Sequence, residues 1–219
     1  MADWARNYGC EITSHERLWV VALNGEADVA AVPLIGAVLR ILRPIADPLA
    51  VDLHAVTFID STMVSALAEP EPAPALLRPS GVARETLERC GAADQVGTVQ
   101  VPVAGAQPHA LVATDREGRV RDWNEAAVGL FGWQPWEALG RPIAAVGVCP
   151  TDEALANEIS LAVGRGEAWD GEFDVLHRGG HMVHTRVREI LLRDVAGRDA
   201  GLLRLCAPSF AGERLPQPM

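Results

Sequence analysis

The pair Asp60-Ser61 is the feature of this sequence with the clearest potential for chemistry. It ends an apolar run, residues 51–59, that has the composition of a buried strand, and a short apolar helix over residues 62–68 is expected to follow. A serine at such a junction can cap the helix by accepting a hydrogen bond from a backbone N–H group. It can also accept a phosphoryl group, which adds a charge of about −1.5 to −2 at neutral pH. The sequence leaves both roles open for Ser61, and Thr62 is an alternative acceptor.

Enzymatic chemistry is not expected. His54, Asp60 and Ser61 have the residue types of a hydrolytic triad, but His54 lies seven positions before Ser61 on one extended segment, too far away to touch it. The sequence contains no GxxxxGK[ST] loop, no HExxH motif and no GxSxG motif.

Three histidines in the second half raise the question of a metal or haem site. His181 and His184 are an odd number of positions apart, so on a strand they face opposite sides. His177 and His181 flank a Gly-Gly turn and can be cross-strand neighbours, but no third ligand accompanies them. We therefore expect solvated histidines, no metal and no cofactor.

Composition indicates a cytoplasmic protein. Lys and Arg number 19 and Asp and Glu 29, a net charge of −10 that disfavours binding to nucleic acid. No apolar run approaches the roughly 18 residues of a membrane span, and the N-terminus lacks a signal-peptide pattern, so no membrane partner is expected. Four widely spaced cysteines without a CxxC pair fit buried thiols in a reducing compartment: Cys10, Cys90, Cys149 and Cys206.

The first half has the rhythm of an α/β domain. A strand is predicted over 18–23 and a turn over 24–28. A helix opened by Pro33 follows, with Leu34, Val38, Ile41 and Leu42 on its apolar face. The remaining predicted elements are a strand from 49 to Asp60, the short helix 62–68, a short strand over 75–78 and a helix over 82–89 between Ser80 and Gly91. The Pro-rich piece EPEPAPA follows the short helix, and residues 97–108 lack a helical period.

The second half predicts an α+β domain, a five-stranded antiparallel sheet with short helices on one side. The expected strands are 109–114, 120–123, 172–176, 182–193 and 202–207, with a hairpin turn over 115–118. The expected helices are one capped by Asn124 and closed by Gly132, a short one over 136–139 and a longer one from Thr151. The predicted boundaries are 1–98 for the first domain, 99–108 for a linker and 109–213 for the second domain.

The first half resembles a STAS domain, the fold of bacterial anti-sigma factor antagonists. The resemblance lies in LWVVALNGEADVAAVP, in PLAVDLHAVTFIDS and in LLRPSGVARETLERCGAADQV, with a Gly-Glu-x-Asp turn at Gly25, Glu26 and Asp28. It implies that Ser61 is phosphorylated by a partner kinase that is also the anti-sigma factor, in the control of transcription and stress response. It further implies a partner-binding surface of Asp28, Asp60, Ser61, Thr62 and Met63.

Two departures from the STAS pattern keep an alternative open. The family usually has glycine where this sequence has Met63, and the helix after Ser61 is cut short by EPEPAPA. These departures favour a first half that assembles complexes without being phosphorylated.

The second half resembles a PAS domain over roughly residues 109–210. The resemblance lies in LVATDREGRVRDWNEAAVGLFGWQPWEALGRP and in WDGE at residues 169–172. It implies a sensory or dimerisation role and a ligand pocket that Trp123, Phe131 and Trp133 could line. The Asn-Cys-Arg motif of flavin photosensors in this class is absent, and Cys149 is expected to be a small buried hydrophobic residue.

The leading hypothesis is an anti-sigma factor antagonist that is switched at Ser61 and carries a PAS domain. Its expected partners are an anti-sigma factor or switch-protein kinase and a second copy of the chain bound through the PAS domain. The alternative is a ligand-binding PAS sensory scaffold whose STAS half only assembles complexes.

Overall fold

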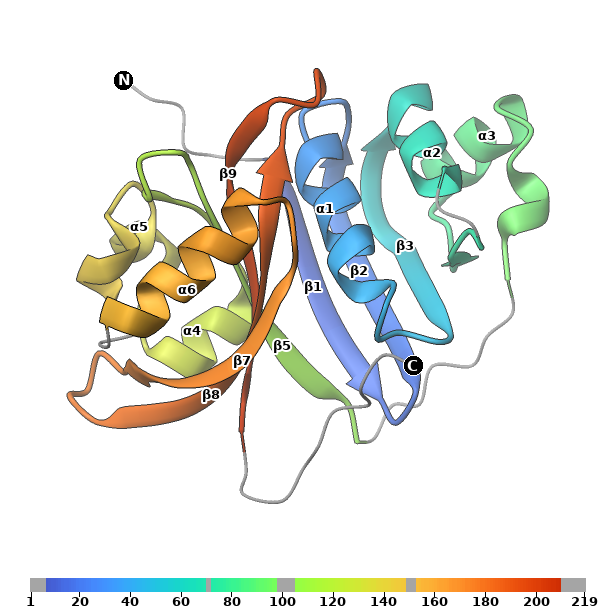
Figure 1. Cartoon of the computed structure of the whole chain (residues 1–219). Coiled ribbons are helices and arrows are strands. Elements are labelled where there is room, and N and C mark those ends of the chain that lie inside the picture. Colours follow the sequence, from blue (N-terminus) through green and yellow to red (C-terminus); the bar gives the residue numbers. More distant parts are fainter. Residues whose placement is uncertain (1–6, 70–71, 98–104, 149–152, 210–219) are drawn as a thin grey trace. The chain divides into compact units, whose positions relative to one another are not determined.

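The computed structural model describes residues 7–69, 72–97, 105–148 and 153–209 (Figure 1). The chain divides into two compact units, Met1–Pro108 and His109–Met219. Helices and strands are interspersed in both units, which confirms a mixed α/β protein.

The first unit is a mixed sheet with helices in its connections. Its strands hydrogen-bond in the order β4-β3-β2-β1, with β1 and β2 antiparallel and the other neighbours parallel. The strands are β1 (Tyr8–His15), β2 (Leu18–Ala27), β3 (Leu49–Ile59) and β4 (Ala75–Leu77). The helices are α1 (Val32–Leu42), α2 (Ser61–Ala68), α3 (Gly81–Arg89) and the 3₁₀ turn η1 (Ala93–Gln95).

Helix α1 forms where the apolar period predicts it. Pro33 stands in its first turn, where a missing N–H group costs nothing, and the predicted face of Leu34, Val38, Ile41 and Leu42 is buried. Helix α1 contacts α2, and both helices lie over the same face of the sheet in Figure 1. The two helices therefore bring their N-terminal segments into one region of the first unit.

Strand β2 is longer than the sequence suggests. The predicted turn over residues 24–28 is instead mostly strand, because β2 stays paired with β3 as far as Ala27 and Ile59. The pairing of β2 with β3 contains two register shifts, one of them between Gly25 and Glu26. Gly25 has a φ of +75°, and a Cβ there would lie 1.9 Å from the Asn7 carbonyl oxygen, so the glycine is required at this bulge.

The second unit is built on antiparallel strands. They pair in the order β6-β5-β9-β8-β7, and each strand range predicted for the second half lies within one of them. The strands are β5 (Gln107–Thr114), β6 (Val120–Trp123), β7 (Trp169–Leu176), β8 (Met182–Arg193) and β9 (Asp199–Pro208). The helices are α4 (Glu125–Phe131), α5 (Pro135–Ala138), the 3₁₀ turn η2 (Ile143–Val146) and α6 (Glu153–Gly164); Thr151, the predicted start of the last helix, lies outside the described residues.

Asn124 is the residue that joins the helices of this unit to its strands. Its Oδ1 atom accepts hydrogen bonds from the N–H groups of Ala127 (3.0 Å) and Leu111 (2.8 Å), and its Nδ2 donates to the His109 carbonyl oxygen (3.1 Å). The predicted cap of α4 therefore also holds the helix start against β5. Gly132 ends α4 in the left-handed conformation, as the sequence predicts.

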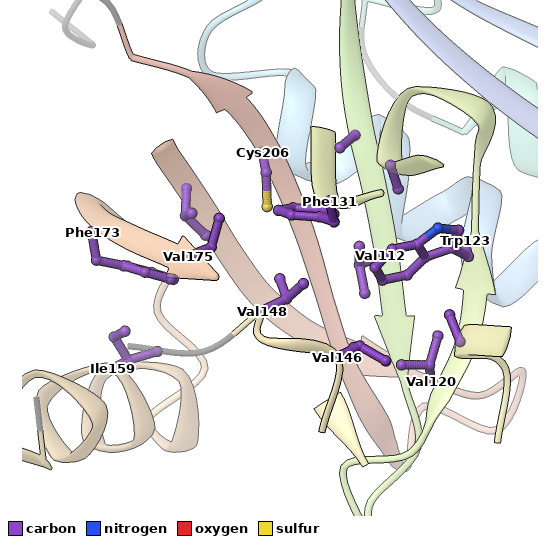
Figure 2. Close-up of a cluster of buried hydrophobic side chains, with 14 of the residues drawn as sticks. Val112, Val120, Trp123, Phe131, Val146, Val148, Ile159, Phe173, Val175 and Cys206 are labelled. Carbon is purple, nitrogen blue, oxygen red and sulfur yellow. The ribbon is translucent and has the colours of Figure 1, made fainter. Parts of the chain in front are cut away.

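The core of the second unit is a continuous apolar cluster between the strands and the helices. Figure 2 shows residues from β5, β6, α4, β7 and β9 pointing into it, together with Val146, Val148 and Ile159. Phe131 is fully buried at its centre. This cluster positions the aromatic side chains that the sequence analysis assigned to a ligand pocket.

Candidate functional site

Asp60, rather than Ser61, caps helix α2. The Asp60 backbone is extended (φ −101°, ψ 170°), and its Oδ1 atom accepts a hydrogen bond of 2.8 Å from the N–H group of Met63. Ser61 is the first residue of the helix. The interpretation of Ser61 as the cap is therefore wrong, because the acceptor role belongs to the residue before it.

The second oxygen of Asp60 binds the turn that precedes α1. Oδ2 accepts a hydrogen bond of 3.0 Å from the N–H group of Val29. In the same turn, Asp28 accepts from the N–H group of Ala30 (2.9 Å) through its own carboxylate. The structure thus brings Asp28 and Asp60 onto neighbouring segments, and Asp60 holds the two helix starts together.

Ser61 and Thr62 are exposed at the N-terminus of α2, and neither hydroxyl group has a hydrogen-bond partner within the described residues. Ser61 contributes only its carbonyl oxygen, which accepts from the Ser65 hydroxyl (3.0 Å). Met63, in contrast, is fully buried. Its side chain belongs to the core of the first unit and is not part of the exposed surface that Ser61 and Thr62 occupy.

His54 is bound to a buried carboxylate and not to Ser61. Asp52 is 2% exposed, and its Oδ2 atom lies 3.1 Å from Nδ1 of His54. Arg78 also forms an ion pair with Asp52 through Nη2 and donates to it through Nε (3.3 Å). This cluster connects β3 with the residue after β4. Because His54 binds Asp52, His54, Asp60 and Ser61 do not form a catalytic triad.

The three aromatic residues expected around a PAS ligand lie next to one another. The rings of Trp123 and Phe131 are 5.4 Å apart, and the Trp123 indole N–H group donates to the Trp133 carbonyl oxygen (2.9 Å). The guanidinium groups of Arg178 and Arg141 lie over the Trp133 ring at 5.2 and 5.6 Å. In Figure 2 Trp123 and Phe131 both point into the apolar cluster, so they pack as core residues.

The histidines of the β7–β8 hairpin form pairs. The rings of His177 and His181 stack with centroids 4.3 Å apart, which confirms them as cross-strand neighbours, and burial together with His181 lowers the pKa of His177. His184 lies 2.8 Å from Asp174, whose hydrogen bond raises the pKa of His184. Within the described residues, no three His, Cys, Asp or Glu side chains gather as metal ligands.

The cysteines differ in their surroundings. Cys10 and Cys206 are buried as expected, and burial raises the pKa of the Cys206 thiol to about 12. Cys90 is exposed, so the prediction of a buried thiol is wrong at this position. It lies at the end of α3, where the chain leaves the helix for a surface turn. Cys149 lies outside the described residues.

A buried ion pair in the second unit was not among the residues predicted from the sequence. Glu189 is 1% exposed and Arg204 7%, and they face each other across β8 and β9. Arg204 donates to both Glu189 oxygens, at 2.5 and 3.2 Å, and to the Val148 carbonyl oxygen at 3.1 Å. The available signal was Arg204, the one charge within the apolar run LLRLCA, since such a charge requires a partner; Glu189 gave no such signal, because β8 also carries several arginines.

The comparisons with known proteins identify the second unit. Residues 105–208 match the family described as PAS fold. No curated protein matches the chain. Similar solved structures include a PAS domain from Colwellia psychrerythraea, 27% identical, with a TM-score of 0.43 over 46% of this chain and 86% of that one.

Two blue-light photoreceptor structures are also similar. The LOV domain of Aureochrome1 in its light state is 17% identical, with a TM-score of 0.42 over 47% of this chain and 82% of that one. The light-state dimer of the fungal photoreceptor Vivid is 20% identical, with a TM-score of 0.40 over 52% of this chain and 83% of that one.

Residues 105–208 therefore carry a PAS domain, which fits a role in signalling or regulation. None of the helices in the described part of the chain combines the length and apolar character that a bilayer crossing requires.

Proposed function

We propose that the chain is a bacterial anti-sigma factor antagonist whose first unit is a STAS domain switched by phosphorylation at Ser61. The observation that carries the proposal is the free, exposed Ser61 hydroxyl at the start of α2, beside an Asp60 that already caps the helix. The strand and helix order of the first unit, with α2 directly after β3, also supports a STAS fold. The PAS domain then serves sensing or dimerisation.

The chemistry of the switch follows from the position of Ser61. A phosphate on Ser61 lies at a helix N-terminus, where the dipole and free N–H groups favour an anion, so α2 stays folded. The same phosphate adds about −1.5 to −2 charges beside Asp28 and Asp60. Unmodified Ser61 therefore permits partner binding, and phosphorylated Ser61 prevents it.

The first test is direct phosphorylation. The full chain is incubated with ATP and the serine kinase that copurifies with it from cells, and peptides are analysed by mass spectrometry. We expect phosphate on Ser61, and Ser61→Ala abolishes it while the matched control Ser65→Ala, on the next turn of α2, does not. Phosphate found only on Thr62 assigns the regulatory site to Thr62 instead of Ser61. Absence of phosphate from both residues contradicts the proposal.

A second test compares partner recovery. Ser61→Ala retains the partner in a pull-down, whereas Ser61→Asp loses it. Equal recovery by the two variants rules out an antagonist of this kind.

A second candidate is a ligand-binding PAS sensory scaffold whose first unit assembles complexes without phosphorylation. The short α2, which ends at Ala68, favours it. An absorbance scan of the purified chain tests it: a band beyond the tryptophan region, from a copurified chromophore, supports the scaffold. In both proposals the chain acts in the cytoplasm, is not an enzyme, and binds neither nucleic acid nor membrane.

A further inference from the structure

The turn of the β7–β8 hairpin, residues 177–181, binds back onto the helices of the second unit. The Arg178 N–H group donates to the carbonyl oxygen of Phe131, the last residue of α4 (2.9 Å). The Arg178 guanidinium forms a bidentate ion pair with Glu137 of α5, at 2.6 Å to each oxygen, and lies over the Trp133 ring. Arg178 therefore connects the hairpin turn to the end of α4 and to α5.

Glu137 also belongs to the start of α5. Its Oε2 atom accepts a hydrogen bond from the Gln134 N–H group (3.1 Å), which is part of the capping box of that helix. The same oxygen accepts from Arg178. Release of the hairpin turn therefore removes a partner from the carboxylate that caps α5, and it removes the contact that Arg178 supplies to the end of α4.

His177 stabilises the turn through a nitrogen that carries no proton. Its Nδ1 atom accepts a hydrogen bond from the Gly179 N–H group (2.8 Å). A neutral imidazole has one accepting nitrogen, whereas both nitrogens of a protonated imidazole are donors. Protonation of His177 is therefore incompatible with this hydrogen bond, because it places one N–H group against another.

The packing of the His177 ring also disfavours a positive charge. The ring is half-buried and stacks on His181 with centroids 4.3 Å apart. Its Nε2 atom faces Gly132, where a Cβ would lie only 2.5 Å away. Burial, together with His181, lowers the pKa of His177. The docked turn therefore favours the neutral ring.

The charged groups near this ring offer little compensation for a proton. Arg178 is the next residue of the turn, His181 is in stacking contact, and Arg141 lies over the same Trp133 ring as Arg178. The neighbouring acids already have basic partners: Glu137 binds Arg178, and Glu172 and Asp174 bind His184. A proton on His177 thus adds charge beside positive neighbours.

We propose that the β7–β8 turn is a proton-sensitive clasp, in which acid protonates His177, breaks its bond to Gly179 and releases Arg178 from α4 and α5. The signal to which the second unit responds is then acidification, and the response is a loosened α4–α5 segment. The inference concerns the second unit alone. It goes beyond the proposed function and does not depend on Ser61.

The direction of the effect follows from the linkage between protonation and docking. Because the pKa of His177 in the docked turn lies below its ordinary value of 6.5, docking is fully supported above pH 6.5 and loses this support as the pH falls through the lowered pKa. His184 acts in the opposite direction, since its pKa is raised and its protonation favours the β7–β8 pairing. Acid is therefore expected to loosen the turn without separating the strands that carry it.

Hydrogen exchange of the full chain tests the clasp. Exchange is followed by mass spectrometry for residues 131–139 at about pH 7.5 and about pH 5.5, and is corrected for the intrinsic pH dependence of amide exchange. His177→Asn is the test variant, because the Asn oxygen can accept from the Gly179 N–H group but is not protonated in this range. His184→Asn is the matched control in the same hairpin. Circular dichroism at both pH values confirms that each variant is folded.

In the wild type we expect the corrected exchange of residues 131–139 to be about twofold or more faster at the lower pH. His177→Asn is expected to exchange slowly at both pH values, and His184→Asn to keep the wild-type response. Equal exchange of the wild type at both pH values overturns the proposal. A wild-type response in His177→Asn, or loss of the response in His184→Asn, also overturns it.

A second measurement needs no variant. The amide signals of Arg178 and Gly179 are followed by NMR over the same pH range, together with the ring signals of His177. We expect both amides to titrate with the midpoint of the ring, because one donates to α4 and the other to the ring itself. If His177→Asn exchanges rapidly at both pH values, this titration decides, and an Arg178 amide that does not follow His177 overturns the clasp.

Discussion

At the scale of single residues, Asp60 has the largest structural role near the candidate site. One of its oxygens closes the first turn of α2 and the other holds the turn before α1. Ser61, one position further, contributes only a carbonyl group to the helix. The two residues that the sequence presents as a pair therefore have separate tasks, one structural and one available for modification.

Replacement of Asp60 tests this division. Asp60→Ala removes the cap and the link to Val29, and we expect it to lower the free energy of unfolding by about 1–2 kcal/mol in urea. Ser61→Ala is expected to change it by less than about 0.5 kcal/mol, because no side-chain contact is lost. Ser80→Ala, which removes the equivalent cap of α3, provides the reference for a simple cap. A Ser61→Ala chain as unstable as Asp60→Ala contradicts the assignment.

At the scale of elements, β8 is the strand with the most electrostatic pairing. On one side it faces β9 with the buried Glu189–Arg204 pair. On the other side it faces β7 in a ladder of opposite charges, in which Asp170, Glu172 and Asp174 stand opposite Arg188, Arg186 and His184 in register. Such cross-strand pairs fix register, because a slip of one residue places every side chain on the wrong face.

The buried pair allows a double-mutant cycle. Arg204→Met leaves the Glu189 carboxylate uncompensated in the core, and we expect a loss of about 3–5 kcal/mol in the free energy of unfolding. Glu189→Leu/Arg204→Met is expected to lose less than Arg204→Met, since no charge remains buried. Arg198→Ala, which breaks an exposed pair with Asp194, serves as the control and costs less than about 1 kcal/mol. If the separate losses in the free energy of unfolding from the Glu189 and Arg204 substitutions add up in the double variant, the two residues do not act as a pair.

The charged ladder predicts a pH effect in the β7–β8 hairpin. Asp174 and Glu172 raise the pKa of His184 above its ordinary value of 6.5, so protonated His184 favours the folded hairpin. The contribution is complete below that ordinary value and is lost as the pH rises through the raised pKa. NMR titration of the His184 ring measures it, and Asp174→Asn is expected to move the pKa back down. An unchanged His184 titration in Asp174→Asn is incompatible with this pairing.

Sequence patterns located most of these elements but few of their contacts. The apolar face of α1 and the caps Ser80 and Asn124 depend on local spacing, which a sequence displays directly. The extension of β2 through residues 24–27 depends on its pairing with a strand some thirty residues away, and a local turn signal cannot report that. Strand β1 escaped prediction for the same reason, because its position is set by the antiparallel pairing with β2.

The candidate site was predicted in part. Asp60 and Ser61 were found at the junction where the structure has them, but the exposed Phe58 was assigned to a buried strand. The assignment depended on the apolar composition of residues 51–59, and composition does not report the bulge at Thr57. The STAS resemblance implied that Met63 belongs to the partner-binding surface, whereas the helical turn carries its side chain into the core.

At the scale of the whole molecule, the two units of the chain contain different numbers of tryptophan residues. Trp123, Trp133, Trp136 and Trp169 belong to the second unit, and Trp4 and Trp19 belong to the first. Tryptophan fluorescence therefore reports mainly on the PAS unit, whereas circular dichroism reports on the helices of both. Units of this size with their own cores commonly unfold as separate cooperative blocks.

This difference gives a prediction for the full chain. Arg204→Met is expected to lower the urea midpoint seen by tryptophan fluorescence. Asp60→Ala is expected to lower the urea midpoint of the first unit's part of the circular dichroism transition and to leave the fluorescence midpoint unchanged. Val195→Ser, on an exposed turn of the second unit, is the control that leaves both unchanged. Equal shifts of both probes by either variant identify a single cooperative block instead.

The separation of the Asp60 cap from the Ser61 hydroxyl has a practical consequence. Since the Ser61 side chain is exposed and Asp60 provides the cap of α2, position 61 tolerates chemical groups of many sizes. A cysteine introduced there can carry a fluorophore or a photo-crosslinker once the exposed Cys90 is replaced by serine. Labelled in this way, the molecule becomes a sensor for whatever approaches that point inside living cells.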